Sequence, residues 1–309
     1  MVSMCQRRKE VRNTGGVPIM IPHSRLARQP VRKVWSMERL IHERVVALGN
    51  DINKTTLGNY GSASNSYISF TTSHNLPAEP TSDTLLLYII CMSHYINPHS
   101  VMTYFVGITQ QLELYFPSVR DARNSTLICC TLRGCLQEHS TPTVRKRALS
   151  THNLERVTNH YKDSTSHDDK LFIAMLLSGF FGLLRLSKLS FSDNPSLHNW
   201  KKVIRCYTVK MSDAQFEFFL PGHKADRFFE GNCIIISAEH YQQQPLYHFR
   251  RYLTSRDQLH PVSSPLWLTK NGHIPTQSFF INRLKLFFDN TISGQSMRAG
   301  SATALAVIV

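Results

Sequence analysis

Three positively charged residues stand where a cation is hard to explain without an anion. Arg185 ends an apolar run, LFIAMLLSGFFGLLR, and a guanidinium that leaves water is costly unless acceptors or an anion meet it. Arg298 stands at the start of an Ala-rich stretch, GQSMRAGSATALA, where a cation opposes the helix dipole and a bound anion explains it better. Lys224 lies between two strand-like runs, in PGHKADRFFEGN. These residues predict an anion-binding site, with Arg185 buried in it.

Two of these cations also have a purely structural explanation. Arg185 can pair with the dipole at the C-terminal end of a helix. Lys224, with Asp226, Arg227 and Glu230 nearby, can belong to the solvated tip of a hairpin. The sequence leaves both alternatives open.

Other chemistries lack the residues they need. The phosphate loop G-x-x-x-x-G-K-[ST] and the nucleophile elbow G-x-S-x-G are both absent. His167, Asp168 and Asp169 resemble a metal triad, but acidic residues in the first turn of a helix already have a role against its dipole. The 7 cysteines show no C-x-x-C spacing, and none of the 15 histidines pairs with them at zinc-finger spacing. No metal site and no small-molecule cofactor are therefore expected.

The elements that would carry the cations are helices followed by a small sheet. In the first half, apolar residues such as Val101, Phe105 and Ile108 fall on one helical stripe, and Asn97-Pro98 is a typical helix start. After Trp200 the apolar period changes to two, which is typical of strands. The expected helices cover 36–48, 56–70, 83–95, a stretch from Pro98, 121–137, 150–161, the run that reaches Arg185, 246–253, 276–288 and a stretch from about Arg298; the expected strands are 203–209, 216–220 and 233–237. The predicted fold class is mainly α with a small antiparallel β-sheet, an α+β fold.

These patterns divide the chain into four expected segments. They are a basic flexible tail at 1–34, a helical domain at 35–140, a basic linker at 141–149 and a second domain at 150–309. In the linker, Arg145, Lys146 and Arg147 suit a DNA contact, a solvated linker or a nuclear import signal equally well. Arg133, in the helix before the linker, is a further DNA-contact candidate.

The charge balance points to a polyanionic partner. Lys and Arg total 35 against 21 Asp and Glu, which gives a net charge of +14 and a pI near 9.6. The longest apolar run is interrupted by Arg185 before it reaches the roughly 18–20 residues that a bilayer requires, so no membrane partner is expected. The N-terminus has basic residues but no apolar segment behind them, so an intracellular protein is expected.

The chain resembles the catalytic domain of the tyrosine recombinases, a phage-integrase-like family, in three motifs that occur in the same order. They are an arginine in GLLRLSKL, a lysine in LPGHKADRFFEGN and an arginine in GQSMRAG. The phrasing is particularly similar to that of mobile-element recombinases in fungal genomes. The resemblance covers about 35–309. It implies a SAM-like helical core-binding domain, a catalytic domain, double-stranded DNA as the partner, homo-oligomers on that DNA and a nuclear location.

The resemblance also implies roles for individual residues. Arg185 and Arg298 would stabilise the charge that grows on a pentacoordinate phosphorus, and Lys224 would protonate the leaving 5′-oxygen. Gln295 stands where the family has a histidine, and it can bind a phosphate oxygen but cannot shuttle protons. Lys188 stands where the family has an acidic residue, so a carboxylate brace is replaced by a like charge near Arg185.

The family's nucleophile is a tyrosine on a helix some tens of residues beyond the second arginine, and no tyrosine follows Tyr252. The resemblance therefore implies a C-terminally truncated recombinase that has no nucleophile of its own and is inactive alone unless another protomer supplies a tyrosine. The sequence leaves two alternatives: a DNA-binding module without catalysis, and a helical protein-interaction module.

Overall fold

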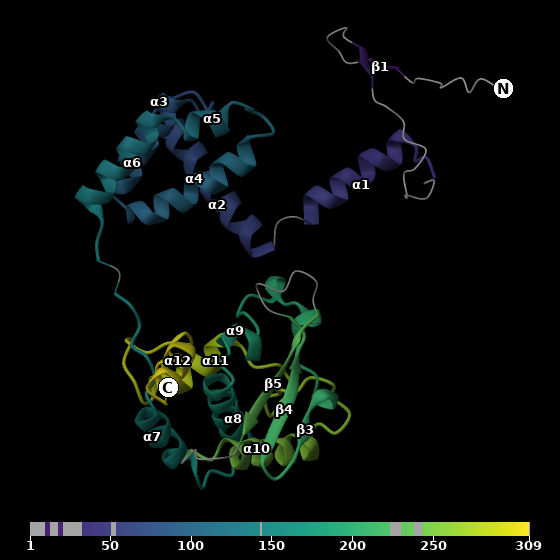
Figure 1. Ribbon diagram of the computed structural model, residues 1–309. Helices are drawn as coiled ribbons and strands as arrows, with labels where there is room; N and C mark the ends of the chain where they lie inside the picture. Colours follow the sequence, from purple (N-terminus) through teal and green to yellow (C-terminus); the bar gives the residue numbers. More distant parts are fainter. Residues whose placement is uncertain are drawn as a thin grey trace, which may run out of the picture. The chain divides into compact units, whose positions relative to one another are not determined.

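The computed structural model (Figure 1) describes residues 10–12, 18–20, 33–50, 54–142, 144–222, 230–237 and 243–308. The chain falls into two compact units, Met1–Thr56 and Leu57–Val309. Lys224 and most of the expected basic tail lie outside the described residues. The segment boundaries expected from the sequence stay predictions.

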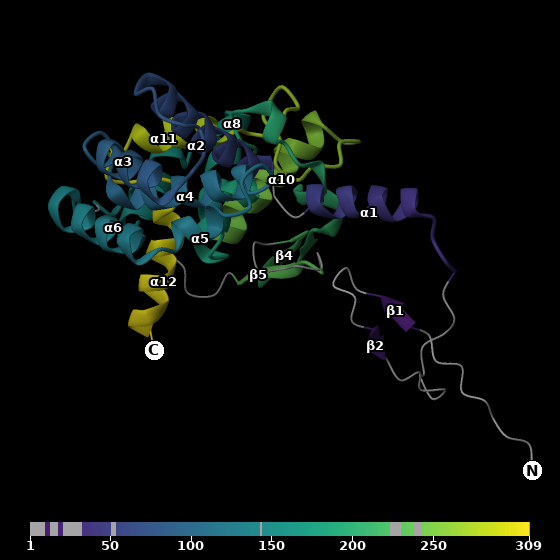
Figure 2. The same ribbon diagram turned by 90° about the horizontal axis from the view of Figure 1, so that it is seen from above.

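The described residues of the first unit before residue 51 form two short strands and one helix, which Figure 2 shows from a second direction. Strands β1 (Glu10–Arg12) and β2 (Pro18–Met20) pair antiparallel, with Val11 opposite Ile19. Helix α1 (Met37–Asn50) corresponds to the helix predicted at 36–48. The two strands were not predicted, because three-residue strands are too short to show a period.

A bundle of helices begins the second unit and has its own core. Its buried centre includes Tyr67, Tyr88 and Phe105. Asn97 caps the helix that starts at Pro98, as predicted. Ser125 caps a new helix, so the single helix predicted at 121–137 is two helices. The bundle consists of α2 (Lys54–Ser73), α3 (Ser82–Ser93), α4 (Pro98–Leu112), α5 (Val119–Arg123) and α6 (Thr126–His139).

The rest of the second unit combines helices with a three-stranded antiparallel sheet in the order β3-β4-β5. In β4, Phe216 and Phe218 alternate with exposed or half-buried neighbours and face the core, which explains the period of two in the sequence. The elements are α7 (Thr151–Tyr161), α8 (His167–Phe181), α9 (Leu186–Leu189), β3 (Lys210–Met211), β4 (Gln215–Leu220), β5 (Asn232–Ser237), α10 (Pro245–Leu259), α11 (Gln277–Lys285) and α12 (Ser296–Ile308).

The strand predicted at 203–209 is wrong. A 3-10 turn, Trp200–Lys202, precedes this segment, and a second one, Cys206–Thr208, lies within it. Its backbone bonds go elsewhere than to β4: Leu266 N–H donates to Ile204 O at 2.8 Å, and Cys206 N–H donates to Ser264 O at 2.8 Å. Val203 and Ile204 are buried, but the hydrogen-bond partner of the segment lies at residues 264–266 and not in β4.

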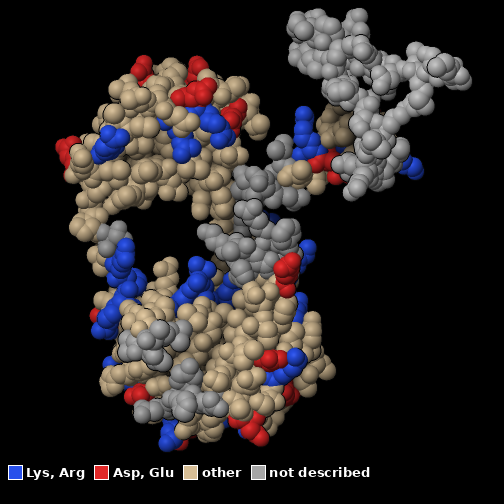
Figure 3. Space-filling model, in the orientation of Figure 1, with Lys and Arg blue, Asp and Glu red and all other residues tan. Residues whose placement is uncertain are grey.

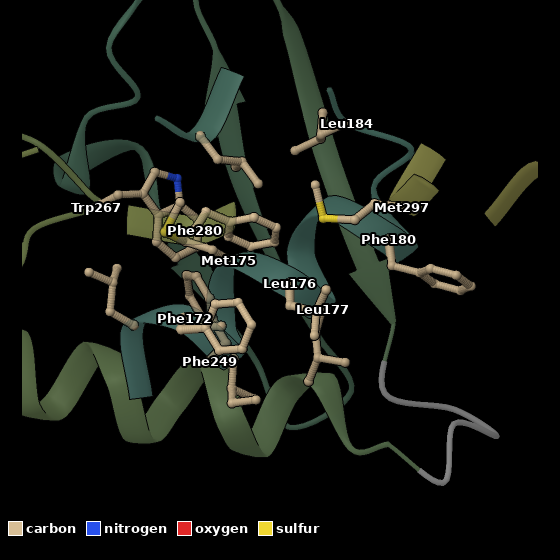
Figure 4. Close-up of a cluster of buried hydrophobic side chains, with 14 of the residues drawn as sticks. Phe172, Met175, Leu176, Leu177, Phe180, Leu184, Phe249, Trp267, Phe280 and Met297 are labelled. Atoms are coloured by element: carbon tan, nitrogen blue, oxygen red, sulfur yellow. The ribbon is translucent and has the colours of Figure 1, made fainter. Parts of the chain in front are cut away.

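Helix α8 is the centre of this core. Every side chain from Leu171 to Leu177 is buried, so the helix is enclosed on all its faces. Helices α7, α10 and α12 pack against it. Phe249 of α10 stacks on Phe216 of the sheet with ring centroids 4.0 Å apart, and Figure 4 shows Phe249 near Phe172 of α8. The packing around α8 therefore fixes the position of the residues that directly follow this helix.

Candidate functional site

The end of α8 positions Arg185. Gly182 is the C-terminal cap residue of α8, and Leu183 follows it with a φ of 50°, in the left-handed region of backbone conformations. Leu183 N–H donates to Phe180 O, and Leu184 N–H donates to Gly179 O at 2.9 Å, which is the Schellman pattern of a helix C-terminus. The chain leaves the core at this turn, and Arg185 follows in an extended conformation immediately before α9.

The start of α12 brings the second arginine to the same place. Met297 is fully buried, and it packs against α8 at Gly179, where an added Cβ would lie 2.9 Å from its sulfur. One turn earlier, Gly294 approaches Leu186 of α9 so closely that a Cβ would lie 2.7 Å from Leu186 Cδ2. Arg298, next to Met297, is thereby held beside the segment that carries Arg185.

Two cavities share the two arginines. The first has a volume of about 880 Å³ and is lined by Gly182, Leu183, Leu184, Arg185, Lys188, Leu220, Asn232, Cys233, Ile234 and Arg298. The second has a volume of about 830 Å³ and is lined by Arg185, Leu186, Ser187, Gln277, Ile281, Ser293, Gly294, Gln295, Arg298, Ala299 and Ala302. Arg185 and Arg298 therefore lie at the boundary between the first cavity and the second. Gln295, which the sequence marked as a candidate site residue, lines the second cavity.

The expectation that Arg185 is buried is wrong. Both Arg185 and Arg298 are exposed, because the apolar helix ends at Phe181 and the turn carries the chain out of the core. The alternative in which Arg185 belongs to the C-terminal end of a helix is also wrong, since it precedes α9. Within the described part of the chain, neither guanidinium makes a hydrogen bond or an ion pair. Two fixed cations with no protein acceptor suit an external anion.

Lys188 is a third cation in the first cavity. It lies three residues after Arg185 on α9, it is half-buried, and its Nζ donates to Gly222 O at 2.6 Å. In the sequence, Lys188 stood out only as a departure from a family pattern and not as a site residue. The three-residue spacing on a helix was the signal that could have placed it beside Arg185.

The thiol that lines the first cavity is not an activated nucleophile. Cys233 lines the first cavity, and burial raises the pKa of its thiol, with a further rise from the Glu217 carboxylate. The thiol is therefore protonated near neutral pH and is a weak nucleophile. No tyrosine is among the described residues that line either cavity.

The basic linker packs along the segment that leads into α12. Lys146 Nζ donates to Asn290 O at 2.5 Å, and Arg147 N–H donates to Thr291 O at 2.8 Å. Leu149 is fully buried, and its carbonyl lies so close to Gly300 that a Cβ there would be 1.8 Å from the oxygen. The linker thus supports the backbone of α12, while its charged side chains stay exposed.

The predicted DNA-contact residues are on the surface but do not line the cavities. Arg145, Lys146 and Arg147 are exposed on the linker, and Arg133 is exposed on α6. Figure 3 shows Lys and Arg side chains along the segment that leads into α7 and on the edge of the same body near α9 and α12. Their contact with DNA stays a prediction, as does the role of Lys224.

The apparent metal triad before α8 has structural partners. His167 lies between Ser255 Oγ and Leu268 O, at 2.9 Å from each, and Asp168 accepts the backbone N–H of Lys270 at 2.8 Å. Over the described ranges no group of three metal-ligating side chains forms. In those same ranges no helix has the length and apolar character needed to cross a bilayer.

The fold is the integrase-like fold of the tyrosine recombinases, which confirms the predicted fold class of helices with a small antiparallel sheet. One solved structure with this fold is a lambda integrase tetramer bound to a Holliday junction, with a TM-score of 0.50 and 12% identity over 98% of this chain and 86% of that one. Another is the XerH site-specific recombinase bound to palindromic difH substrate in a post-cleavage complex, with a TM-score of 0.50 and 11% identity over 75% of this chain.

This chain spans 63% of the length of that XerH chain. No protein-family model matches the sequence, and no curated protein matches it. At such low identity the likeness establishes the fold and leaves the function to the site.

Proposed function

We propose that this chain binds the sugar-phosphate backbone of double-stranded DNA, with phosphates held by Arg185 and Arg298 at the boundary of the two cavities. The observation that carries the proposal is the convergence of these two guanidiniums, 113 residues apart along the chain, without a protein acceptor in the described residues. Guanidinium groups bind phosphate oxygens with two parallel hydrogen bonds, which a diffuse surface charge does not provide. Gln295 adds a neutral donor beside them.

Two further facts favour DNA over other polyanions. The net charge of +14 supplies the long-range attraction that nucleic-acid binding requires. Two solved structures with this fold are complexes with a Holliday junction and with a difH substrate. A nuclear location and an origin in a mobile element are part of the same proposal, and a fluorescent fusion protein tests the location.

In the proposed recombinase-like chemistry, the two arginines would stabilise charge on the reacting phosphate. A covalent step of this kind also requires a tyrosine nucleophile, and none of the described residues that line the two cavities is a tyrosine. We therefore propose that the chain by itself binds DNA without cutting it, and that cleavage requires a tyrosine from another protomer in an assembly on DNA.

The binding experiment measures fluorescence anisotropy of a labelled duplex at several salt concentrations, with wild type, Arg185→Ala and Arg298→Ala. Each cavity variant is expected to weaken binding about tenfold and to reduce the salt slope by about one phosphate contact. Arg250→Ala is the matched control, because it removes an exposed arginine of α10 outside both cavities, and it is expected to change affinity less than about threefold.

A salt-independent affinity, or an equal loss in the Arg250→Ala control, would contradict the proposed site. Cleavage is tested separately with a nicked suicide substrate, on which no covalent protein-DNA adduct is expected. An adduct that disappears in Arg185→Ala would overturn the non-cleaving part of the proposal and leave DNA binding in place.

A further inference from the structure

Lys188 occupies a position in the first cavity that a merely solvated lysine would not hold. Its stem emerges from α9, a helix of four residues that follows Arg185 directly. The side chain is half-buried, and its ammonium donates to the carbonyl oxygen of Gly222, two residues after the end of β4. A long side chain that is held by such a contact loses less rotamer freedom when a ligand arrives than a free one does.

The electrostatics of the first cavity point the same way. Arg185, Lys188 and Arg298 all line it, and none of its described lining residues is acidic. Three like charges that line one cavity repel one another, and an anion bound among them reduces that repulsion. The neutral polar residues Asn232 and Cys233 complete the polar part of the lining and add no negative charge near neutral pH.

We infer that Lys188 is a third cation of the phosphate site, and that the Gly222 carbonyl holds its ammonium in position to contact a phosphodiester oxygen. This inference rests on the proposed function, because it assigns a further ligand of the same DNA phosphate. An ammonium acts as a point charge, so Lys188 would add affinity and salt dependence, while the two guanidiniums supply the directional bonds.

The competing explanation is that Lys188 only braces the end of β4 against α9. The variant Lys188→Gln separates the two roles, because its amide can still donate to Gly222 O but carries no charge. Lys188→Arg keeps the charge and the ability to donate. Lys270→Gln is the matched control: Lys270 is exposed and its backbone bonds to Asp168 at the start of α8, whereas the cavity lies beyond the other end of that helix.

The experiment measures duplex anisotropy against salt for these three variants and Arg185→Ala, together with the melting temperature of each. Lys188→Gln is expected to weaken binding about tenfold and to lower the salt slope by about one, with an unchanged melting temperature. Lys188→Arg is expected to stay within about threefold of wild type, and Lys270→Gln is expected to match wild type in both affinity and salt slope.

The outcomes separate the inference from the function on which it rests. If Arg185→Ala weakens binding and Lys188→Gln does not, Lys188 is no phosphate ligand and the proposed function stands. If neither variant changes the affinity or the salt slope, the proposed function itself fails. If Lys188→Gln lowers the melting temperature and the affinity together and Lys188→Arg does the same, the residue is a brace and the inference is overturned.

Discussion

Two arginines of the second unit show opposite ways of holding a guanidinium. Arg256 of α10 is 2% exposed, and its donors reach Asp257 Oδ1 at 2.6 Å, Pro265 O at 2.9 Å and also Ser263 O. Arg185 is exposed beside a cavity, and its guanidinium makes no hydrogen bond within the described residues. The guanidinium N–H groups of Arg256 donate to acceptors within the protein, whereas those of Arg185 are available to a ligand.

The comparison also explains why the sequence suggested the wrong buried arginine. Arg185 follows an apolar run and looks buried, whereas Arg256 lies in a polar stretch, RRYLTSRDQL, and looks exposed. Burial depends on which segments pack around a residue, and the loop that covers Arg256 comes from 263–265. A buried charge that is fully hydrogen-bonded indicates a structural role.

The largest expected effect comes from removing the buried guanidinium. Arg256→Ala leaves the carbonyls of Ser263 and Pro265 without donors and opens a cavity, so it should lower the free energy of unfolding by about 3–5 kcal/mol. Urea denaturation measures the loss. Arg250→Ala, an exposed arginine of the same helix, should change stability by less than about 0.5 kcal/mol. A loss below about 1 kcal/mol for Arg256→Ala would break the comparison.

In contrast to Arg256, a buried basic group that has no opposite charge beside it should be neutral. His248 tests this expectation. Burial lowers the pKa of His248 from 6.5 to about 4, and Arg251 adds a smaller repulsion. Because the folded pKa lies below the unfolded one, this contribution to stability is fully present above pH 6.5 and is lost as the pH falls toward 4.

Between pH 7 and 4.5 the loss that His248 causes should be about 1–2 kcal/mol. Urea midpoints measured across this range should fall less steeply for His248→Gln than for wild type. Parallel curves for the two proteins would show that His248 is charged, or fully solvated, in the folded state.

The framework between the cavity arginines can be perturbed at Gly294. An alanine there places Cβ 2.7 Å from Leu186 Cδ2 and 2.9 Å from Leu186 Cβ, so the backbone must shift as well as the side chain, and Gly294→Ala should cost about 1–3 kcal/mol and weaken duplex binding several-fold. The matched control is Gly58→Ala in α2, where an added Cβ meets nothing within 4 Å and should stabilise the helix by about 0.5–1 kcal/mol. Unchanged DNA affinity in Gly294→Ala would show that this approach does not position Arg298.

A smaller effect of opposite sign is expected at the turn before Arg185. Leu183 adopts a left-handed conformation that glycine tolerates better, so Leu183→Gly should stabilise the protein by about 0.5–1 kcal/mol after the larger unfolded-state entropy of glycine is counted. Thermal unfolding measures the gain. A destabilised variant would mean that the Leu183 side chain contributes more by packing than its backbone costs.

The smallest stability effect should come from the cavity arginines themselves. Arg185→Ala and Arg298→Ala remove exposed side chains that have no acceptor among the described residues, so each should change the free energy of unfolding by less than about 0.5 kcal/mol. Removing one of two neighbouring cations can even stabilise the free protein slightly. Urea denaturation of both variants without DNA provides the check, and a loss above about 1 kcal/mol would place these arginines in the same class as Arg256.

The sequence by itself determined most of the helices, two strands of the sheet and the order of the cations. Apolar spacing predicted the helices and the strands at 216–220 and 233–237, and Asn97 and Pro98 predicted the start of α4. Residue types and motif order were also enough to mark Arg185, Gln295 and Arg298 as candidate site residues. The elements follow from local backbone geometry and from side-chain period, which neighbouring residues encode.

The tertiary structure alone decided what each charge meets. It exposed Arg185, buried Arg256, joined Lys188 to Gly222 and bonded the segment 203–209 to residues 264–266 instead of to β4. The physical reason is the same in each case. Burial and hydrogen-bond partners are set by segments that are distant along the chain, and a local pattern of residue types contains no information about which of those segments will arrive.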